Sequence, residues 1–375
     1  MKTVALISNT SWSIFNFRAN LISALQQQGF RVVAIAPPDG YSARIAGLGC
    51  AYLPLPMDNK GRNPVRDGLL FARLLTLLSR EKPMCLLGFT IKPNIYGSFA
   101  ARLLGIPVIN NIAGLGSVFV SRGLTQSLVR GMYRIALRRS RRVFFQNPDD
   151  FQLFIEQGIA RAEVSEVLPG SGVDTAHFAP KQRQPSDGPV TFLFLGRLLV
   201  EKGVPEFVEA ARAVKSIRSD ARFQLLGFAG VENPSAIHPG EVRKWAAEGI
   251  IENLGETHDV RQHIANADCI VLPSYYREGV PRSLLEAASM ERPVITTNTP
   301  GCRETVLDGA SGFLVSPRSV EDLMAKINRF LDLPRHVKEE MGRQGRLHVQ
   351  AKFDEKIVIS RYTSAIAALT LPPRN

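Results

Sequence analysis

The chain has 375 residues, and its hydrophobic content of 45% is ample for about two globular cores, which excludes a disordered protein. The formal net charge of +12 belongs entirely to the first half, where residues 1–185 carry 22 Lys and Arg against 10 Asp and Glu. Residues 186–375 carry 24 basic and 24 acidic residues, so a polyanionic partner (nucleic acid, an anionic membrane or a diphosphate-bearing substrate) is expected for the first half.

The four cysteines show neither a metal-ligand spacing nor a paired pattern, which fits a reducing cytoplasm. No stretch approaches the ~20 consecutive apolar residues of a membrane span. The N-terminus also lacks the length and cleavage site of a signal peptide. We therefore expect a protein that is soluble or attached to a membrane only at its surface.

Strand and helix patterns alternate through the first half, as they do in parallel α/β domains. The first turn, residues 9–16, contains no glycine, which argues against a dinucleotide-binding fold because a diphosphate there needs a close backbone approach. The expected elements are the strand Val4–Ser8, the helix Phe17–Gln28, the strand Arg31–Ala36, the helix Arg66–Arg80, and the strands Met84–Thr90 and Pro107–Ile112.

Polar residues occur at the ends of two of these strands. Lys92 either anchors an acceptor phosphate or is a solvated lysine. Asn110 and Asn111 either hydrogen-bond to a ligand or form a turn.

A strongly basic segment follows at residues 126–145. Apolar residues at spacings of three and four predict an amphipathic helix over this range. Its flank carries six arginines within thirteen residues, namely Arg130, Arg134, Arg138, Arg139, Arg141 and Arg142. They either form the solvated face of a core-packing helix or contact anionic lipid headgroups or a lipid diphosphate, and the basic surplus favours the lipid.

The domain junction is expected within residues 163–187, which include a polar, proline-containing linker. The strand Val190–Leu195 follows, and Gly196, Arg197 and Lys202 then precede the helix Val204–Ser216. Two cations five residues apart can reach one diphosphate, arginine as a fork and lysine as a point charge, although surface charge is the default for such a turn.

The most informative stretch runs from Leu272 to Glu286. A short apolar run, Asp268–Leu272, predicts a buried parallel strand, and Pro281 is expected in the first turn of the helix that follows. Glu278 then lies in a loop at the carboxyl end of a strand, where doubly wound sheets bind ligands, and Glu286 lies in the first turns of the helix. A helix start attracts a diphosphate, and a carboxylate can accept hydrogen bonds from a ribose diol. The alternative is two solvated surface charges.

Glu278 and Glu286, with seven residues between them, resemble the signature of retaining GT-B glycosyltransferases of family 4. The resemblance covers nearly the whole chain and is most specific over residues 272–314. Thr90–Gly97 and Ile109–Gly116 resemble the branch that adds N-acetylhexosamines to polyprenyl-diphosphate-linked sugars in bacterial glycan assembly.

The resemblance implies an α/β GT-B fold in which two Rossmann-like, doubly wound domains face a cleft. We expect an N-terminal acceptor- and membrane-facing domain over residues 1–168 and a nucleotide-sugar-binding domain over residues 169–352. Residues 353–375 are expected to cross back to the first domain.

The resemblance also implies roles for individual residues. Arg197 and Lys202 would stabilise the leaving diphosphate, and Glu278 would hold hydroxyls of the transferred sugar. Glu286 would bind the ribose. The other expected donor-binding residues are Gly196, Gly279, Val280, Ser283, Glu256 and Thr257, the last two at the uracil, and Lys92, Asn110, Asn111, Arg130, Arg134 and Arg138 would face the acceptor or the membrane.

The sequence departs from the family at two positions. Ala113 stands where many members have a histidine that contacts the sugar, and Glu291 stands where a glycine usually follows the helix, so a different helix end is expected there.

The implied reaction is retaining transfer of a sugar, an N-acetylhexosamine, from a UDP-sugar to a polyprenyl-diphosphate-linked saccharide during bacterial surface or protein glycan biosynthesis. No metal cofactor is expected, because no Asp-x-Asp element is present, and the enzyme would act at the cytoplasmic face of the membrane without binding nucleic acid. Two alternatives stay open, a nucleotide-sugar epimerase on the same fold and a non-enzymatic binder of nucleic acid or membrane surfaces. The second lacks recognised RNA modules with aromatic platforms.

Overall fold

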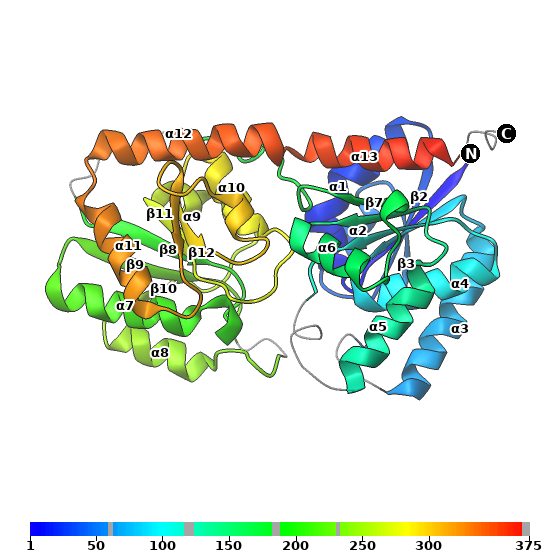
Figure 1. Cartoon of the computed structure of the whole chain (residues 1–375), viewed down its shortest axis with the longest axis horizontal. Coiled ribbons are helices and arrows are strands. Elements are labelled where there is room, and N and C mark those ends of the chain that lie inside the picture. The colour runs from blue at the N-terminus through cyan, green and yellow to red at the C-terminus, as the bar shows by residue number, and fades with distance from the viewer. Residues whose placement is uncertain (59–62, 116–123, 182–187, 230–232, 370–375) are drawn as a thin grey trace. The chain divides into compact units, whose positions relative to one another are not determined.

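The computed structural model describes residues 1–58, 63–115, 124–181, 188–229 and 233–369. Gly116 of the Ile109–Gly116 motif and residues 182–187 of the expected linker lie outside the described residues. The chain divides into two compact units (Figure 1). Unit 1 comprises Met1–Ser171 with Lys356–Asn375, and unit 2 comprises Gly172–Glu355.

Unit 1 is built on a seven-stranded parallel sheet in the order β3-β2-β1-β4-β5-β6-β7. Its strands are β1 (Thr3–Ile7), β2 (Arg31–Ala36), β3 (Ala51–Pro54), β4 (Cys85–Phe89), β5 (Val108–Ile112), β6 (Arg142–Phe145) and β7 (Ser165–Val167). Its helices are α1 (Ser11–Gln27), α2 (Ser42–Ala46), α3 (Pro64–Glu81), the π-helical turn η1 (Pro93–Gly97), α4 (Ser98–Leu103), α5 (Leu124–Leu137), α6 (Pro148–Glu156), the 3₁₀ turn η3 (Ala162–Val164) and α13 (Glu355–Ala368).

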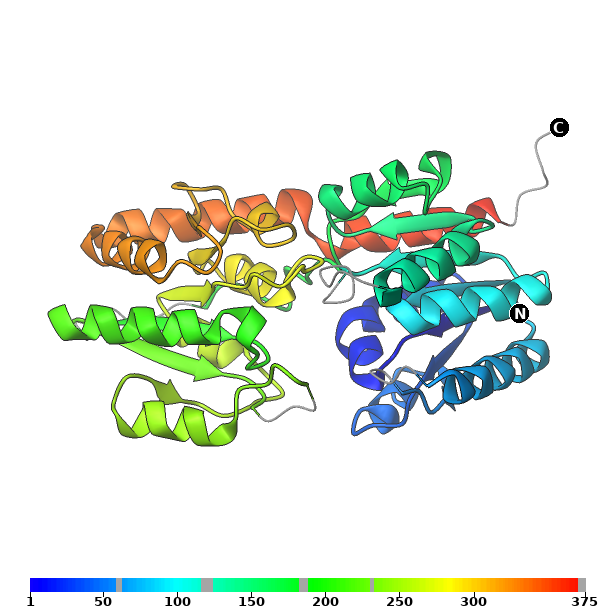
Figure 2. The ribbon, with the colours of Figure 1, turned by 60° about the horizontal axis from the view of Figure 1, so that its bottom comes forward.

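Helices cover both faces of this sheet (Figure 2). Side chains alternate across a strand, so Val4 and Leu6 of β1 pack with α1 and α13, whereas Ala5 and Ile7 pack with α3 and α4. Burial on both faces explains why the strands are continuous apolar runs rather than alternating ones.

The basic segment forms a shorter helix than the sequence predicts. Helix α5 ends at Leu137, and the expected helix over residues 126–145 is therefore wrong beyond that point. Val143, Phe144 and Phe145 are fully buried in β6, because branched and aromatic residues pack well in the sheet, and Arg142 begins that strand.

Unit 2 contains a six-stranded parallel sheet in the order β10-β9-β8-β11-β12-β13. Its strands are β8 (Val190–Leu195), β9 (Ala221–Leu226), β10 (Glu252–Asn253), β11 (Cys269–Leu272), β12 (Val294–Thr297) and β13 (Gly312–Val315). Its helices are the 3₁₀ turn η4 (Val200–Lys202), α7 (Val204–Ile217), α8 (Pro239–Ala247), α9 (Arg261–Asn266), α10 (Arg282–Ser289), the 3₁₀ turn η5 (Arg303–Thr305), α11 (Val320–Asp332) and α12 (Arg335–Lys352).

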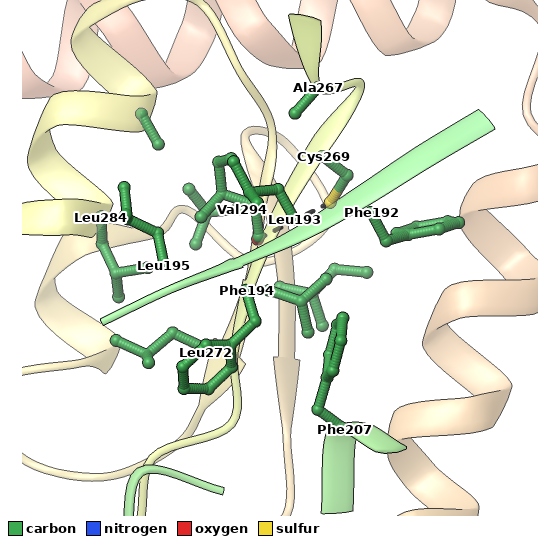
Figure 3. Packing of buried hydrophobic residues seen from close by; sticks show 14 of the residues in the cluster. Phe192, Leu193, Phe194, Leu195, Phe207, Ala267, Cys269, Leu272, Leu284 and Val294 are labelled. Carbon is green, nitrogen blue, oxygen red and sulfur yellow. Dashed lines mark hydrogen bonds between the residues drawn. The ribbon is translucent and has the colours of Figure 1, made fainter. Parts of the chain in front are cut away.

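Strand β8 carries the centre of the unit 2 core (Figure 3). Phe194 contacts Phe207 of α7, with ring centroids 5.8 Å apart, and Phe192 stacks on Phe223 of β9 at 5.3 Å. Leu195 points to the opposite face, beside Leu284 of α10 (Figure 3). This packing holds α10 against the sheet and so sets the direction in which the helix begins.

The end of α10 also corrects an expectation. Glu291 has a left-handed φ of 59°, which is the conformation that a glycine usually provides after a helix. The Glu291 and Arg292 N–H groups donate to the Ala288 and Ala287 carbonyls at 3.0 and 2.9 Å, which is the ordinary pattern of a helix end. The different helix end expected from Glu291 is therefore wrong, because the glutamate adopts the same left-handed turn.

Candidate active site

The strand order places a topological switch point between β8 and β11 in unit 2. From β8 the chain proceeds to β9 and β10 on one side, and β11, β12 and β13 extend the sheet on the other. Ligands of doubly wound sheets bind outside the carboxyl ends of the strands at such a point. The loops that follow β8 and β11 contain Arg197, Lys202 and Glu278, so this edge of the sheet is the candidate site.

Lys202 and Glu278 form an ion pair across the switch point. Both side chains are only 12% exposed. The turn that carries Lys202 is tied closely to the other loop, because Gly203 has a φ of 79° and a Cβ on it would lie 2.2 Å from the Pro273 carbonyl oxygen. The Ser274 hydroxyl donates to Glu278 Oε1 at 3.1 Å, so the carboxylate is held by a cation and a buried hydroxyl.

The loop with Glu278 is also fixed from the side of β12. The hydroxyls of Thr297 and Thr299 both donate to the Ser274 carbonyl, the latter at 3.2 Å. Gly301 has a φ of 86°, and a Cβ there would lie 1.6 Å from the Gly279 carbonyl oxygen. The backbone around Glu278 is therefore clamped at residues 274 and 279.

Helix α10 begins directly after this loop. Pro281 is the residue before the helix rather than part of its first turn, which corrects the sequence expectation by one position. Within the described residues no side chain caps the helix start, and the Leu284 and Leu285 N–H groups turn back to the Pro281 carbonyl at 3.2 and 3.4 Å. The first turn includes Ser283, and backbone N–H groups at such a start favour an anion.

Glu286 lies one turn further along α10 and is paired within its own helix. Arg282 Nε donates to Glu286 Oε1 at 2.9 Å, and both side chains are 14% exposed. Burial raises the pKa of the Glu286 carboxyl, and the Arg282 guanidinium opposes this rise. Arg282 is a site residue absent from the sequence-based expectations, although its i,i+4 spacing from Glu286 is a readable signal of pairing.

Backbone contacts join the loops after β8, β9 and β10. A Cβ on Gly227 would lie 1.7 Å from the Gly196 carbonyl oxygen, and the Gly227 N–H donates to the Gly255 carbonyl at 2.8 Å. Gly255 precedes Glu256, whose side chain is exposed, and Thr257, which is partly buried and bonded to the backbone of Asp259 at 3.1 Å. The residues expected at a nucleobase thus lie on the same edge of the sheet as Gly196.

Arg197 follows Gly196 and has an exposed side chain. No hydrogen bond or ion pair joins its guanidinium to another residue in the part of the chain that the structure describes. Gly279 and Val280 are buried beside Glu278. The structure therefore gathers the predicted donor-binding residues at the loops of one sheet edge, with Lys202 and Glu278 in direct contact.

The predicted acceptor-facing residues have structural partners in unit 1. Lys92 Nζ pairs with Asp67 Oδ1 at 2.6 Å, and the Tyr96 hydroxyl donates to Asp67 Oδ2 at 2.9 Å. Burial and the Asp67 carboxylate raise the pKa of Tyr96 to about 12. Asp67 on α3 thus holds Lys92, so Lys92 is not a freely solvated lysine, and its role as an anchor for an acceptor phosphate stays a prediction.

Asn110 and Asn111 lie inside the unit rather than on its surface or in a turn. Their side chains are 0% and 1% exposed within β5. The Asn110 amide donates to Asn94 Oδ1 and Ser98 Oγ at 3.0 Å each, and the Asn111 amide donates to the Tyr362 hydroxyl at 2.9 Å. The expectation that they form a turn is wrong, and in this structure both amides serve an internal polar network.

Two of the three arginines expected to face the membrane, Arg130 and Arg134, lie on α5, and Arg138 directly follows its last residue. Arg134 donates to the carbonyls of Gly158 and Gln157 at 3.1 and 2.6 Å and so caps the end of α6. Arg130 and Arg134 line an open depression of about 460 Å³, together with Ser127, Gly131 and Gln157. Arg138 is exposed.

In the described residues, no group of three or more His, Cys, Asp or Glu side chains is arranged to hold a metal ion. Helices of the described ranges are too short or too polar to cross a bilayer.

Two doubly wound parallel units, with a lysine and a helix start at the switch point of the second, form an arrangement that suits binding of a phosphorylated ligand. Comparison with known proteins identifies the family. Residues 16–170 match the model of the glycosyl transferase 4-like domain, and residues 189–332 match the model of glycosyl transferases group 1. The chain belongs to this family of GT-B glycosyltransferases and is a hexosyltransferase.

Curated relatives match along most of the chain. The N,N'-diacetylbacillosaminyl-diphospho-undecaprenol alpha-1,3-N-acetylgalactosaminyltransferase of Campylobacter jejuni is 25% identical over 379 residues, which cover 96% of each chain. An Escherichia coli UDP-Gal:alpha-D-GlcNAc-diphosphoundecaprenol alpha-1,3-galactosyltransferase is 24% identical over 72% of this chain and 71% of its own.

Solved structures share the fold. A glycosyltransferase from Rickettsia africae superposes with a TM-score of 0.80 at 18% identity, covering 98% of both chains. The Anabaena protein HepE, solved with UDP and glucose, has a TM-score of 0.79 at 17% identity and covers 98% of this chain and 100% of its own. The GT-B fold expected from the sequence is thereby confirmed.

Proposed function

We propose that this protein transfers an N-acetylhexosamine from a UDP-sugar to a polyprenyl-diphosphate-linked saccharide, with retention of anomeric configuration and without a metal ion. The observation that carries the proposal is the meeting of Lys202, Glu278 and the start of α10 at the switch point of unit 2. The Campylobacter relative, whose name specifies a diphospho-undecaprenol acceptor and N-acetylgalactosamine transfer, supports the choice of substrates.

The donor diphosphate is the ligand that this edge of the sheet suits. Lys202 and the N–H groups at the start of α10 supply positive charge, and Arg197 extends an exposed guanidinium from the same edge. As the anomeric bond breaks, charge grows on the leaving diphosphate, so these groups stabilise the transition state more than the bound donor.

Glu278 and Glu286 complete the donor assignment. When a phosphate recruits Lys202, the Glu278 carboxylate becomes available to accept hydrogen bonds from hydroxyls of the transferred sugar. Glu286, one turn into α10, accepts from the ribose diol while Arg282 holds its carboxylate in place.

The reaction runs on one face of the sugar. The bond from C1 to the leaving phosphate oxygen breaks, the acceptor hydroxyl oxygen bonds to C1 from the same side, and its proton passes to a phosphate oxygen of the departing UDP. No protein nucleophile is needed, and the role of the chain is to hold charge and orientation.

The acceptor carries a lipid, and α5 supports attachment to the cytoplasmic face of the membrane. Leu128 and Ile135 lie seven residues apart on this helix and are 64% and 54% exposed. Arg134 and Arg138 flank them, so an apolar stripe bordered by cations faces away from the unit 1 core, as in helices that lie in a membrane interface.

The test is an assay of the purified protein with UDP-N-acetylgalactosamine, UDP-N-acetylglucosamine or UDP-galactose and an undecaprenyl-diphosphate-linked saccharide, in the presence of EDTA. We expect one N-acetylhexosamine to be added with an α linkage, read by mass spectrometry and NMR of the product. A new sugar nucleotide formed without any acceptor would instead indicate an epimerase, and a requirement for added Mg²⁺ or Mn²⁺ would contradict the metal-free mechanism.

A further inference from the structure

Unit 1 has a switch point of its own, between β1 and β4. The loops at the carboxyl ends of β1 and β2 therefore border a position where doubly wound sheets bind ligands. Helix α1 starts four residues after β1, and Tyr41 precedes α2 in the loop after β2. The groups assigned above to the donor all belong to unit 2, and the groups at this edge of unit 1 have so far been given no ligand.

Aromatic side chains gather at this edge. We define the aromatic patch as the side chains of Trp12, Phe15, Phe17 and Tyr41, together with that of Arg44. The Trp12 and Phe17 rings meet edge to face with centroids 5.0 Å apart, and the Phe15 and Tyr41 rings lie 5.7 Å apart. Trp12 is 37% exposed, although a large aromatic residue at the start of a helix gains little by facing water.

Hydrogen bonds hold the patch in place from the polar side. Asp39 Oδ2 accepts from the backbone N–H of Trp12 at 3.1 Å, and Asp39 Oδ1 accepts from the backbone N–H of Tyr41 at 2.8 Å. One exposed carboxylate thus ties together the start of α1 and the loop before α2. The Arg44 guanidinium lies 5.0 Å from the centre of the Tyr41 ring. Trp12 also touches Phe17, but it is the exposed member of the four aromatic residues, whereas Phe15, Phe17 and Tyr41 are half-buried, so Trp12 is the ring most accessible to a ligand.

We propose that the aromatic patch binds the saccharide of the acceptor, with a pyranose ring stacked on Trp12. This inference rests on the proposed function, because it presumes a saccharide acceptor. The face of an aromatic ring is electronegative, and the polarised C–H groups on one face of a pyranose are drawn to it. Each Asp39 oxygen accepts one backbone N–H, and because the carboxylate is exposed and has further lone pairs it can also accept hydrogen bonds from sugar hydroxyls, which a purely apolar partner would leave unused.

Intrinsic fluorescence tests the proposal without any turnover. The chain has two tryptophans, Trp12 and Trp245, and the second lies on α8 in unit 2. In a Trp245→Phe variant all indole emission comes from Trp12. We expect a saturable change in this emission on titration with a lipid-free disaccharide of N-acetylhexosamines and none with UDP alone. An unchanged emission at saturating disaccharide overturns the proposal.

Kinetics provide the second readout. Trp12→Ala should raise the acceptor KM about tenfold, while the donor KM stays within about twofold, and Trp12→Phe should recover most of the loss because it keeps an aromatic face. Ile217→Ala, an exposed apolar residue of unit 2, is the matched control and should change neither constant. Thermal unfolding of each variant reports whether it is folded.

The two proposals fail separately. Absence of sugar transfer by the wild-type chain would refute the proposed function, whereas the fluorescence titration would still judge the patch. Normal transfer with an acceptor KM that Trp12→Ala leaves unchanged would refute the patch alone.

Discussion

The amine of Lys202 has two potential partners, the Glu278 carboxylate that it contacts in this structure and the diphosphate that it is proposed to bind. We predict that Lys202→Ala lowers kcat about 10²- to 10³-fold, because a cation aimed at the leaving group acts mainly in the transition state. Steady-state kinetics with saturating donor measure the effect. Lys244→Ala, which removes an exposed lysine from α8, is the matched control, and near-normal turnover of Lys202→Ala would remove this residue from the mechanism.

Glu291 provides a prediction about stability. Its left-handed backbone strains a residue that has a Cβ, and glycine adopts the same conformation without that strain. Glu291→Gly should therefore raise the free energy of unfolding of unit 2 by about 1 kcal/mol. Urea denaturation followed by circular dichroism measures this change. Glu248→Gly is the comparison, because Glu248 follows α8 with an ordinary φ of −71° and glycine relieves no strain there. A lower midpoint for Glu291→Gly would show that the side chain matters more than its backbone.

Residue-level prediction from the sequence succeeded where a residue's place in the chain decides its neighbours. The position of Glu278 after a buried strand placed it correctly at a strand end. The contacts of Ser274 with Glu278 and of Asp67 with Lys92 were not predicted, because they depend on loop conformation and on helix placement. Asn110 and Asn111 were misread because asparagine usually favours turns, and only the buried network around β5 overrides that preference.

Helix α5 exposes two apolar side chains, Leu128 and Ile135, which a simple core-packing helix would bury. We predict that Leu128→Glu and Ile135→Glu each weaken binding to phosphatidylglycerol vesicles at least fivefold, since each places a charge where apolar burial is expected. Vesicle co-sedimentation measures the partition. Leu347→Glu, on α12 in unit 2, is equally exposed and should leave binding unchanged.

The arginines on α5 and directly after it require a more selective design. Arg138→Glu should also weaken vesicle binding, by about 1 kcal/mol or more because it reverses a charge near an anionic surface. Arg134 is unsuitable for this test because it also caps α6, so its loss would combine a structural change with a change in charge. Full retention of binding in all three substitutions would contradict the membrane assignment of this helix.

The bounds of the elements show which signals are reliable. Strand β8 was predicted to the residue, since a mostly apolar run between a proline (Pro189) and a glycine (Gly196) has clear ends. The end of α5 was missed because the arginine-rich run from residue 138 to 142 carries no glycine or proline to mark a stop. The helical spacing of apolar residues therefore extends in the sequence into residues that form strand β6 in the structure.

At the scale of the whole molecule, the chain returns at its C-terminus to the unit with which it began. Tyr362 of α13 is fully buried in the unit 1 core, and its hydroxyl accepts from the Asn111 amide at 2.9 Å. Burial raises the pKa of Tyr362 to about 12. The last helix is thus part of the unit 1 core, and residues 251 positions apart share one hydrogen bond.

Tyr362→Phe tests this link. Removing the hydroxyl leaves a buried amide donor unpaired, which should lower the free energy of unfolding of unit 1 by about 1–3 kcal/mol. Trp12 lies in unit 1, so its emission in the Trp245→Phe background follows this unit during urea denaturation. Ser360→Ala, on the exposed side of the same helix, should shift the midpoint little, and equal effects from the two substitutions would contradict the role of the buried bond.

The two-sheet architecture was predictable as a whole because strands that are buried on both faces are continuous apolar runs, and both halves of the chain contain them. The strand orders were not, since register and neighbour choice depend on how helices pack between consecutive strands.

Three glycines restrict how this site can diverge. Gly203, Gly227 and Gly301 each bring backbone against backbone so closely that even an alanine at these positions would collide with a carbonyl oxygen of the opposing loop. The backbone of the loops at the donor edge therefore tolerates little change during evolution. The side chains that project from those loops are not limited by these close backbone contacts. New sugar preferences in descendants of this chain should therefore arise by exchanging such side chains on an inherited backbone frame.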